Sequence, residues 1–256
     1  MNHVTNDQSM NKVTKDELKS EWEALAPGWI ERTRHQGDAH RAGLLDDYML
    51  AACGEVDGLR VLDSGCGEGR FCRLLAERGA AEVVGIDLCQ PLIDAARALP
   101  MDRLSYRVGD AEDLSDFQSE SLDLAVSYLN QCDLPKFERN NEAVHRILKK
   151  GGRFIVANLH PMRSAVGGWK KDAQGRKEHA IVDHYFEEGQ RSWKMLNVDF
   201  TNFHRTLATY MNAFLQAGFS LEKLVEPRPT AAQMKQYPDI EDEDRVPNFI
   251  IYILRK

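Results

Sequence analysis

The sequence predicts an α/β fold, a doubly wound and mostly parallel sheet of seven strands with helices on both faces. Short apolar runs alternate with helix-like patterns from residue 59 to residue 158, and repeated strand–helix units of this kind pair their strands in parallel. The first run ends in Asp63 and continues into the alternating glycines Gly65, Gly67 and Gly69. This pattern is typical of a strand that turns sharply into a helix beside a ligand. Two strand patterns near the end of the chain complete the sheet.

The N-terminal part is expected to be helical after a short tail. Residues 1–13 are polar and are predicted to be disordered. Thr14 and Glu17 have the spacing of a capping box, which predicts a helix beginning there. Pro27 is expected to interrupt or kink that helix. Apolar residues recur with a helical period over 40–53, which predicts a second helix.

The alternating elements then follow in order. The predicted strands cover residues 59–63, 82–87, 104–108, 122–127 and 153–158, and the helices between them cover 70–78, 91–99 and 135–149. Pro91 suits the first turn of its helix, and Gly151-Gly152 is expected to end the last one. After an insertion at about 160–204, a helix over 207–217 closes at Gly218, and the final strands cover 220–226 and 248–255. We expect one domain over 14–256, in which residues 14–56 form a helical cap.

The charge balance disfavours a nucleic-acid partner. The formal net charge is -7, and Lys and Arg form no long basic run, so a polyanion would be repelled. The acidic run over 239–244 is expected to be a solvated loop. The composition, 43% hydrophobic and 29% charged residues, is that of an ordinary soluble protein.

The cysteines and the apolar runs predict a cytoplasmic protein without a membrane span. The five cysteines are odd in number and lack C-x-x-C spacing, which favours a reduced compartment over a disulfide scaffold. Residues 1–13 contain no apolar segment of a secretory signal. No apolar run approaches the ~20 residues that a bilayer requires.

The glycine spacing predicts a nucleoside ligand that carries positive charge. Asp87 follows the second apolar run, twenty residues after Gly67, where an acid can bind ribose hydroxyls. A dinucleotide site usually has G-x-G-x-x-G/A spacing, but here the spacing is G-x-G-x-G and Arg70 takes the place of the third small residue. Asp63 and Glu68 flank the loop, and they would repel a pyrophosphate but attract a cation.

This segment resembles the first motif of class I S-adenosylmethionine-dependent methyltransferases of the bacterial small-molecule type, and the resemblance covers about residues 59–255. A second match lies at Gly109-Asp110-Ala111-Glu112-Asp113-Leu114, which is similar to the family's G-D-A-x-x-L turn. The resemblance implies a Rossmann-like sheet with the strand order 3-2-1-4-5-7-6. It also implies S-adenosyl-L-methionine as the cofactor and S-adenosyl-L-homocysteine as the product.

The resemblance and the strand-end positions predict nine cofactor-binding residues. Asp63 is expected to hold the ammonium group, Asp87 the ribose hydroxyls and Asp110 the adenine amino group. Gly65 and Gly67 would let the backbone approach the methionine part. The full predicted set is Asp63, Gly65, Cys66, Gly67, Asp87, Leu88, Asp110, Ala111 and Trp29.

The methyl acceptor is expected to be a small molecule, a metabolite or a secondary metabolite, methylated on oxygen or nitrogen. The predicted fourth strand does not end in the N/D-P-P-Y/F turn of enzymes that methylate nucleobase or amide nitrogens. Tyr128, His160 and His204 are the catalytic candidates, since Tyr128 ends that strand and a histidine can take a proton near neutral pH. The insertion at 160–204 is rich in aromatic residues and is expected to form an acceptor lid. No metal site is predicted.

Three other functions stay open at this point. An RNA methyltransferase of the same fold would require clustered basic residues, and only Lys149-Lys150 and Lys170-Lys171 come close. An NAD(P)-dependent oxidoreductase is disfavoured by the glycine spacing. A binding protein that retains the cofactor without catalysis is compatible with the sequence, and so is any oligomeric state.

Overall fold

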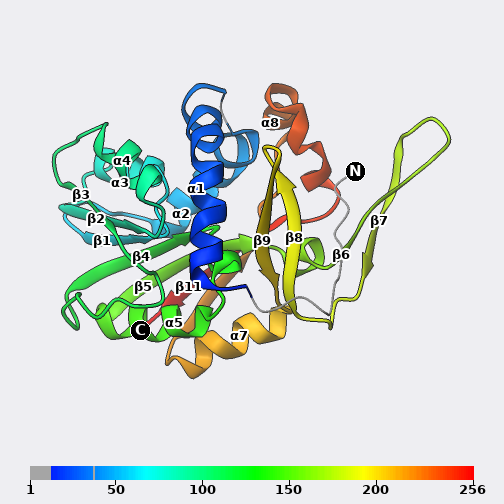
Figure 1. Ribbon diagram of the computed structural model, residues 1–256. Helices are drawn as coiled ribbons and strands as arrows, with labels where there is room; N and C mark the ends of the chain where they lie inside the picture. The colour runs from blue at the N-terminus through cyan, green and yellow to red at the C-terminus, as the bar shows by residue number, and fades with distance from the viewer. Residues whose placement is uncertain (1–12, 37) are drawn as a thin grey trace.

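A sheet of seven strands runs through the centre of the protein. The computed structural model describes residues 13–36 and 38–256. The predicted disordered tail over residues 1–13 lies outside them apart from Val13. The strand order is β10-β11-β5-β4-β1-β2-β3, with β11 antiparallel to both of its neighbours (Figure 1). Counted along the chain this is the order 3-2-1-4-5-7-6, so the predicted topology is confirmed. The strands are β1 (Arg60–Ser64), β2 (Glu82–Asp87), β3 (Leu104–Val108), β4 (Leu122–Tyr128), β5 (Leu148–Leu159), β10 (Ser220–Val225) and β11 (Phe249–Arg255).

Helices cover both faces of the sheet because neighbouring strand residues face opposite sides. Val61 joins a core that is covered by α2, α3 and α4, whereas Leu62 joins a second core under α5 and α7. Figure 1 shows α5 and α7 on one side of the sheet and α3 and α4 on the other. The helices are α2 (Asp46–Cys53), α3 (Arg70–Glu77), α4 (Gln90–Arg97), α5 (Phe137–Ile147) and α7 (Leu207–Gln216). The result is the three-layer arrangement expected of repeated strand–helix units.

The N-terminal helix α1 (Lys15–Glu31) begins at the predicted capping box. The Glu17 backbone N–H donates to Thr14 Oγ1 at 3.2 Å, and the Thr14 N–H donates to a Glu17 carboxylate oxygen at 2.7 Å. Pro27 lies inside α1, and the helix continues to Glu31, so the expected interruption does not occur. Two wider turns, η1 (Arg32–Gln36) and η2 (Arg41–Leu45), then lead into α2.

Two hairpins form the insertion after β5 and the short helix α6 (Pro161–Ser164). The first, β6 (Val166–Lys171) with β7 (Lys177–Asp183), projects away from the sheet (Figure 1). The second, β8 (Gly189–Met195) with β9 (Val198–His204), packs against α1. Glu21 of α1 accepts hydrogen bonds from the backbone and the hydroxyl of Thr201, at 2.8 and 3.0 Å.

Two expectations about local structure were wrong. Gly151-Gly152 do not end a helix, because α5 already ends at Ile147 and Leu148 pairs with Leu122 at the start of β5. The acidic run is not a solvated loop but the 3₁₀ helix η4 (Pro238–Asp244), which follows α8 (Ala231–Gln236). Ile240 is fully buried there and anchors η4 to the core. Within the residues that the structure describes, no helix has the length and apolar character of a membrane span.

Candidate cofactor site

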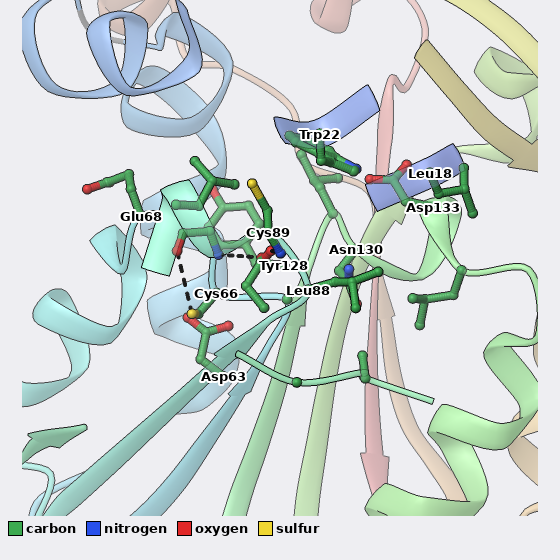
Figure 2. A pocket seen from close by; sticks show the side chains of 18 of the residues that line it. Leu18, Trp22, Asp63, Cys66, Glu68, Leu88, Cys89, Tyr128, Asn130 and Asp133 are labelled. Atoms are coloured by element: carbon green, nitrogen blue, oxygen red, sulfur yellow. Dashed lines mark hydrogen bonds between the residues drawn. The ribbon is translucent and has the colours of Figure 1, made fainter. Parts of the chain in front are cut away.

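A cavity of about 130 Å³ opens beyond the carboxyl ends of β1, β2 and β4, with α1 on its outer side (Figure 2). It lies where the strand order reverses between β1 and β4, the usual place for a ligand in an open α/β sheet. All nine predicted cofactor residues line this cavity, and so does Tyr128. The other two catalytic candidates, His160 and His204, are not among its lining residues.

The glycine loop is held against β2 by its own backbone. The N–H groups of Gly65 and Cys66 both donate to the Ile86 carbonyl at 2.9 Å. Gly65 has φ +80°, and a Cβ there would lie 2.2 Å from Asn130 Cγ. Only glycine permits both this backbone conformation and this approach to Asn130, which follows β4.

Asp87 fixes the glycine loop and the turn after β2 at the same time. Its Oδ2 accepts a hydrogen bond from the Gly67 N–H, and its Oδ1 accepts one from the Cys89 N–H, both at 2.9 Å. Burial raises the pKa of Asp87, while these backbone hydrogen bonds act in the opposite direction. Each carboxylate oxygen keeps a further lone pair for a ligand hydroxyl.

Asp63 presents an unsatisfied carboxyl oxygen at the end of β1. The side chain is 1% exposed, Cys72 Sγ donates to its Oδ2 at 3.1 Å, and its Oδ1 has no hydrogen-bond partner among the described residues. Burial raises the pKa of Asp63 to about 7, and the negative charge of Asp87 acts in the same direction. A buried carboxylate without a counter-ion is costly, so this position favours a ligand that brings positive charge.

Asp110 is shared with the N-terminal helix. Its Oδ2 lies 2.5 Å from Lys15 Nζ in the first turn of α1, and its Oδ1 accepts from the Glu112 N–H at 2.8 Å. Lys15 Nζ also lies 2.6 Å from the buried carboxylate of Glu112. The ion pairs hold α1 against the turn after β3, and Asp110 retains lone pairs toward the cavity. No local sequence signal singles out Lys15.

Tyr128 is held as a hydrogen-bond donor in the cavity wall. Its hydroxyl donates to Asp46 Oδ1 at 2.9 Å, and Arg70 donates to the same carboxylate. The ring packs edge-on against Phe71, with centroids 5.0 Å apart. Burial and the charge of Asp46 raise the pKa of Tyr128 well above its usual range, so its hydroxyl keeps its proton at neutral pH.

The two histidines are bound to protein groups elsewhere. His160 Nδ1 accepts from the Met162 N–H at 3.1 Å, so Nε2 is the protonated nitrogen and faces Glu226 at 3.1 Å. His204 is fully buried, with Nε2 2.8 Å from the Tyr185 carbonyl and Nδ1 2.7 Å from Ser164 Oγ. Burial lowers the pKa of both histidines. Both ring nitrogens of each residue are therefore already used.

Asp133 is a cavity residue that the sequence analysis did not select. It lies in the 3₁₀ turn η3 (Gln131–Asp133), directly after β4, and is 9% exposed. Burial raises its pKa to about 8. Figure 2 shows Asp133 beside Trp22 and Leu18 of α1, across the cavity from Asp63. The position shortly after a central strand was the available sequence signal.

A buried polar network joins the strand ends that surround the cavity. Asn140 of α5 donates to Ser64 Oγ at 3.1 Å and to the Ala111 carbonyl at 2.7 Å. Its Oδ1 accepts from Gln131 Nε2 at 3.1 Å. One side chain thereby connects the end of β1, the turn after β3 and η3, and it keeps the two sides of the cavity in a fixed relation.

The charges of the cavity suit a cationic nucleoside and not a pyrophosphate. Every lysine and arginine among the described lining residues is paired with a carboxylate. The pairs are Lys15 with Asp110 and Glu112, Lys19 with Glu23, Arg41 with Asp38, and Arg70 with Asp46. Asp63, with its unsatisfied oxygen, is the complement of an ammonium group. The residues present therefore fit S-adenosylmethionine, which carries an ammonium and a sulfonium and no phosphate.

Residues 62–156 match a family model described as a methyltransferase domain. The chain is 34% identical to an S-adenosylmethionine-dependent methyltransferase of known structure from Mesorhizobium loti, with a TM-score of 0.73 over 86% of this chain and 99% of the other. A Listeria monocytogenes protein of known structure, assigned as an S-adenosylmethionine-dependent methyltransferase, is 32% identical, with a TM-score of 0.74 over 84% and 97% of the two chains. A ubiquinone biosynthesis O-methyltransferase from Alkalilimnicola ehrlichii is 36% identical over 118 residues, which are 44% of this chain and 47% of that one. This chain thus spans about half the length of the ubiquinone relative.

Proposed function

The chain belongs to the S-adenosylmethionine-dependent methyltransferases, and from that premise we propose that it methylates an oxygen or nitrogen atom of a small-molecule acceptor. S-adenosylmethionine supplies a methyl group that is already activated by the sulfonium. The protein's task is then to bind the donor, to align the acceptor and to exclude water. The observation that carries the proposal is a cavity that has Asp63 on one side and a second buried carboxyl group, Asp133, on the other.

The donor is assigned to the strand ends of β1, β2 and β3. We assign the ammonium group to Asp63, the ribose hydroxyls to Asp87 and the adenine amino group to Asp110. Leu88 would pack against the adenine. Trp29, Cys66 and Ala111 would complete the wall, and Gly65 and Gly67 would allow the backbone to approach the ligand.

The acceptor is assigned to the side formed by η3, α1 and Tyr128. The net charge of the protein and the name of one relative support a small-molecule acceptor. The net charge of -7 disfavours RNA, and the ubiquinone relative has a name that denotes an O-methyltransferase of a small-molecule pathway. We further propose that residues 14–56 act as the cap and 160–204 as the lid of one domain. His160 and His204 would support that lid through their hydrogen bonds and would not touch the acceptor.

Methyl transfer to small molecules is expected in a direct assay. With S-adenosylmethionine present, hydroxylated and amino-substituted aromatic compounds should raise the release of S-adenosylhomocysteine above the background rate, measured by mass spectrometry. Transfer RNA and ribosomal RNA should not raise it. Asp87→Ala, which should bind the donor weakly, is the control: it should release less S-adenosylhomocysteine than the unmodified protein. Methylation of RNA with none of the small molecules would refute the proposed acceptor class.

The affinity for the donor is expected to rise with pH and then to level off near pH 7. A carboxyl binds an ammonium group only when ionised, and Asp63 has its pKa raised to about 7. Below that pH the affinity should increase by up to about tenfold per pH unit, and above it the affinity should be flat. Isothermal titration with S-adenosylmethionine across this range measures the effect.

Ionisation of Asp63 is also expected to change the stability of the unliganded protein, and this effect is unfavourable. Because the unfolded chain loses this proton near pH 4, the free energy of unfolding should fall as the pH rises from there to about 7. Asp63→Asn should flatten both profiles. A donor affinity that is independent of pH in the unmodified protein would refute the assignment of the ammonium group to Asp63.

A further inference from the structure

Asp133 has a free oxygen that faces the cavity. Its Oδ1 lies 3.5 Å from Cys132 Sγ. In the described part of the chain, no hydrogen bond or ion pair ends on its Oδ2, although the residue is only 9% exposed. The cavity is lined by this side chain together with the apolar residues Leu18, Trp22, Leu134 and Pro135. A carboxyl group in such surroundings is costly unless a ligand satisfies it.

The charged groups around Asp133 do not supply that partner. Arg41 of η2 is the cation that faces it, but its guanidinium is paired with Asp38 at 2.8 Å and stacks on the Trp29 ring at 4.6 Å. Two acidic groups also act on it, Glu21 of α1 and Asp87 of β2, and the guanidinium of Arg205 nearby is bonded to backbone carbonyls. Glu21 is itself bonded to Thr201. Asp133 is therefore a carboxyl group without a committed counter-ion.

Arg205 holds the segment that carries Asp133 in place. Its guanidinium donates to the carbonyls of Gln131, Leu134 and Pro135, at 3.2, 2.5 and 3.2 Å. Arg205 is itself 7% exposed. Three backbone carbonyls on both sides of Asp133 are thus fixed by one buried side chain, and a fixed carboxyl group is what recognition of a ligand atom requires.

We propose that Asp133 binds the methyl acceptor and takes the proton from its nucleophilic atom, so that the acceptor carries a hydroxyl or an ammonium group on a flat or apolar body. This inference rests on the proposed function and names the acceptor class of the same site. In the transfer, a proton of the acceptor's hydroxyl or ammonium group moves to Asp133 Oδ2, and the lone pair that is left on oxygen or nitrogen forms the bond to the methyl carbon. The carbon–sulfur bond breaks, and sulfur keeps its electron pair.

The other candidate bases are less suited to this step. Tyr128 donates its proton to Asp46 and has a pKa well above its usual range. Both nitrogens of His160 and of His204 are bonded to protein groups outside the cavity. Asp133 combines a free oxygen with a position among the lining residues.

Binding of small probes to the protein loaded with S-adenosylhomocysteine tests the proposal without a known acceptor. Phenol carries a removable proton, benzylamine carries a charged ammonium group, and fluorobenzene has nearly the shape of phenol without a donor. At about pH 8.5, above the pKa of about 8 of Asp133, phenol or benzylamine should bind roughly tenfold more tightly than fluorobenzene in ligand-detected NMR titrations. A preference for phenol indicates a hydroxyl acceptor, and a preference for benzylamine an amine. Equal binding of all three overturns the proposal.

A variant pair assigns the preference to this side chain. Asp133→Asn should abolish the preference and leave the affinity for fluorobenzene unchanged. Asp94→Asn, at an exposed position of α4 with 60% of its side chain accessible, should leave the preference intact. Calorimetric titration with S-adenosylhomocysteine reports separately on the donor site and on folding of each variant. An intact preference in Asp133→Asn overturns the role of Asp133 alone, whereas failure of the unmodified protein to bind S-adenosylhomocysteine overturns the proposed function.

Discussion

Asp87→Ala is expected to weaken the binding of S-adenosylhomocysteine by roughly 2–4 kcal/mol, the value of a buried, charge-assisted contact with two hydroxyls. This corresponds to an increase in Kd of about thirtyfold to several hundredfold. The carboxylate also holds the Gly67 and Cys89 N–H groups, so its removal releases the glycine loop as well. Isothermal titration gives the affinity.

Asp113→Ala is the matched control for that variant. Asp113 Oδ1 accepts a hydrogen bond from the N–H two residues later, at 3.1 Å from Ser115 N, as Asp87 does from Cys89. Asp113 is exposed and does not line the cavity. It should therefore bind S-adenosylhomocysteine like the unmodified protein. If Asp87→Ala binds S-adenosylhomocysteine with unchanged affinity, the assignment of the ribose hydroxyls to Asp87 is wrong.

Gly65→Ala is expected to lower the free energy of unfolding of the unliganded protein by about 2–5 kcal/mol. The left-handed backbone costs about 1–2 kcal/mol for a residue with a Cβ, and overpacking adds about 1–3 kcal/mol. The new Cβ would lie 2.2 Å from Asn130 Cγ and 2.5 Å from its Cβ, so Asn130 or the glycine loop must shift. The shift would also disturb the cavity, and donor binding should be lost.

Gly67→Ala distinguishes the cost of the left-handed backbone from the cost of the contact with Asn130. Gly67 also has a positive φ, +55°, but a Cβ there meets no atom within 4 Å. Urea unfolding should therefore show only the backbone cost of about 1–2 kcal/mol. Equal destabilisation by the two alanines would contradict the role of Gly65 in the contact with Asn130.

The sheet was predictable because its signals are local. Each central strand is a short apolar run, and the glycine loop follows the first one directly in the sequence. The hairpins β6–β7 and β8–β9 were not predicted, since their aromatic and charged residues show no clear alternation. The η4 turn was misjudged because its acidic residues outnumber Ile240, which anchors it in the core, and because Glu243, one of those acids, is itself buried.

The cavity was predictable where the motif itself supplies the contacts. Asp63, Gly65 and Asp87 come together through β1 and β2, which pair in parallel over the whole of β1. Lys15 and Asp110 are 95 positions apart in the sequence, so a tertiary contact alone joins them. The histidines were predicted from their residue type, but their hydrogen bonds are set by partners in the insertion and in the loop after β10, such as Ser164, Tyr185 and Glu226. A residue's chemistry is visible in a sequence, whereas its neighbours across the fold are not.

Because Arg205 holds η3 in place, the two halves of the cavity depend on different parts of the chain. The donor half is built from the strand ends of β1, β2 and β3, where Lys15 of α1 pairs with Asp110. The half that we assign to the acceptor depends on a residue that directly follows the inserted hairpins. Mutations that lengthen, shorten or repack residues 160–204 can therefore reshape the acceptor half through Arg205, while the glycine loop of the donor half keeps its own hydrogen bonds to β2. A lineage with this architecture can exchange acceptors and keep its donor.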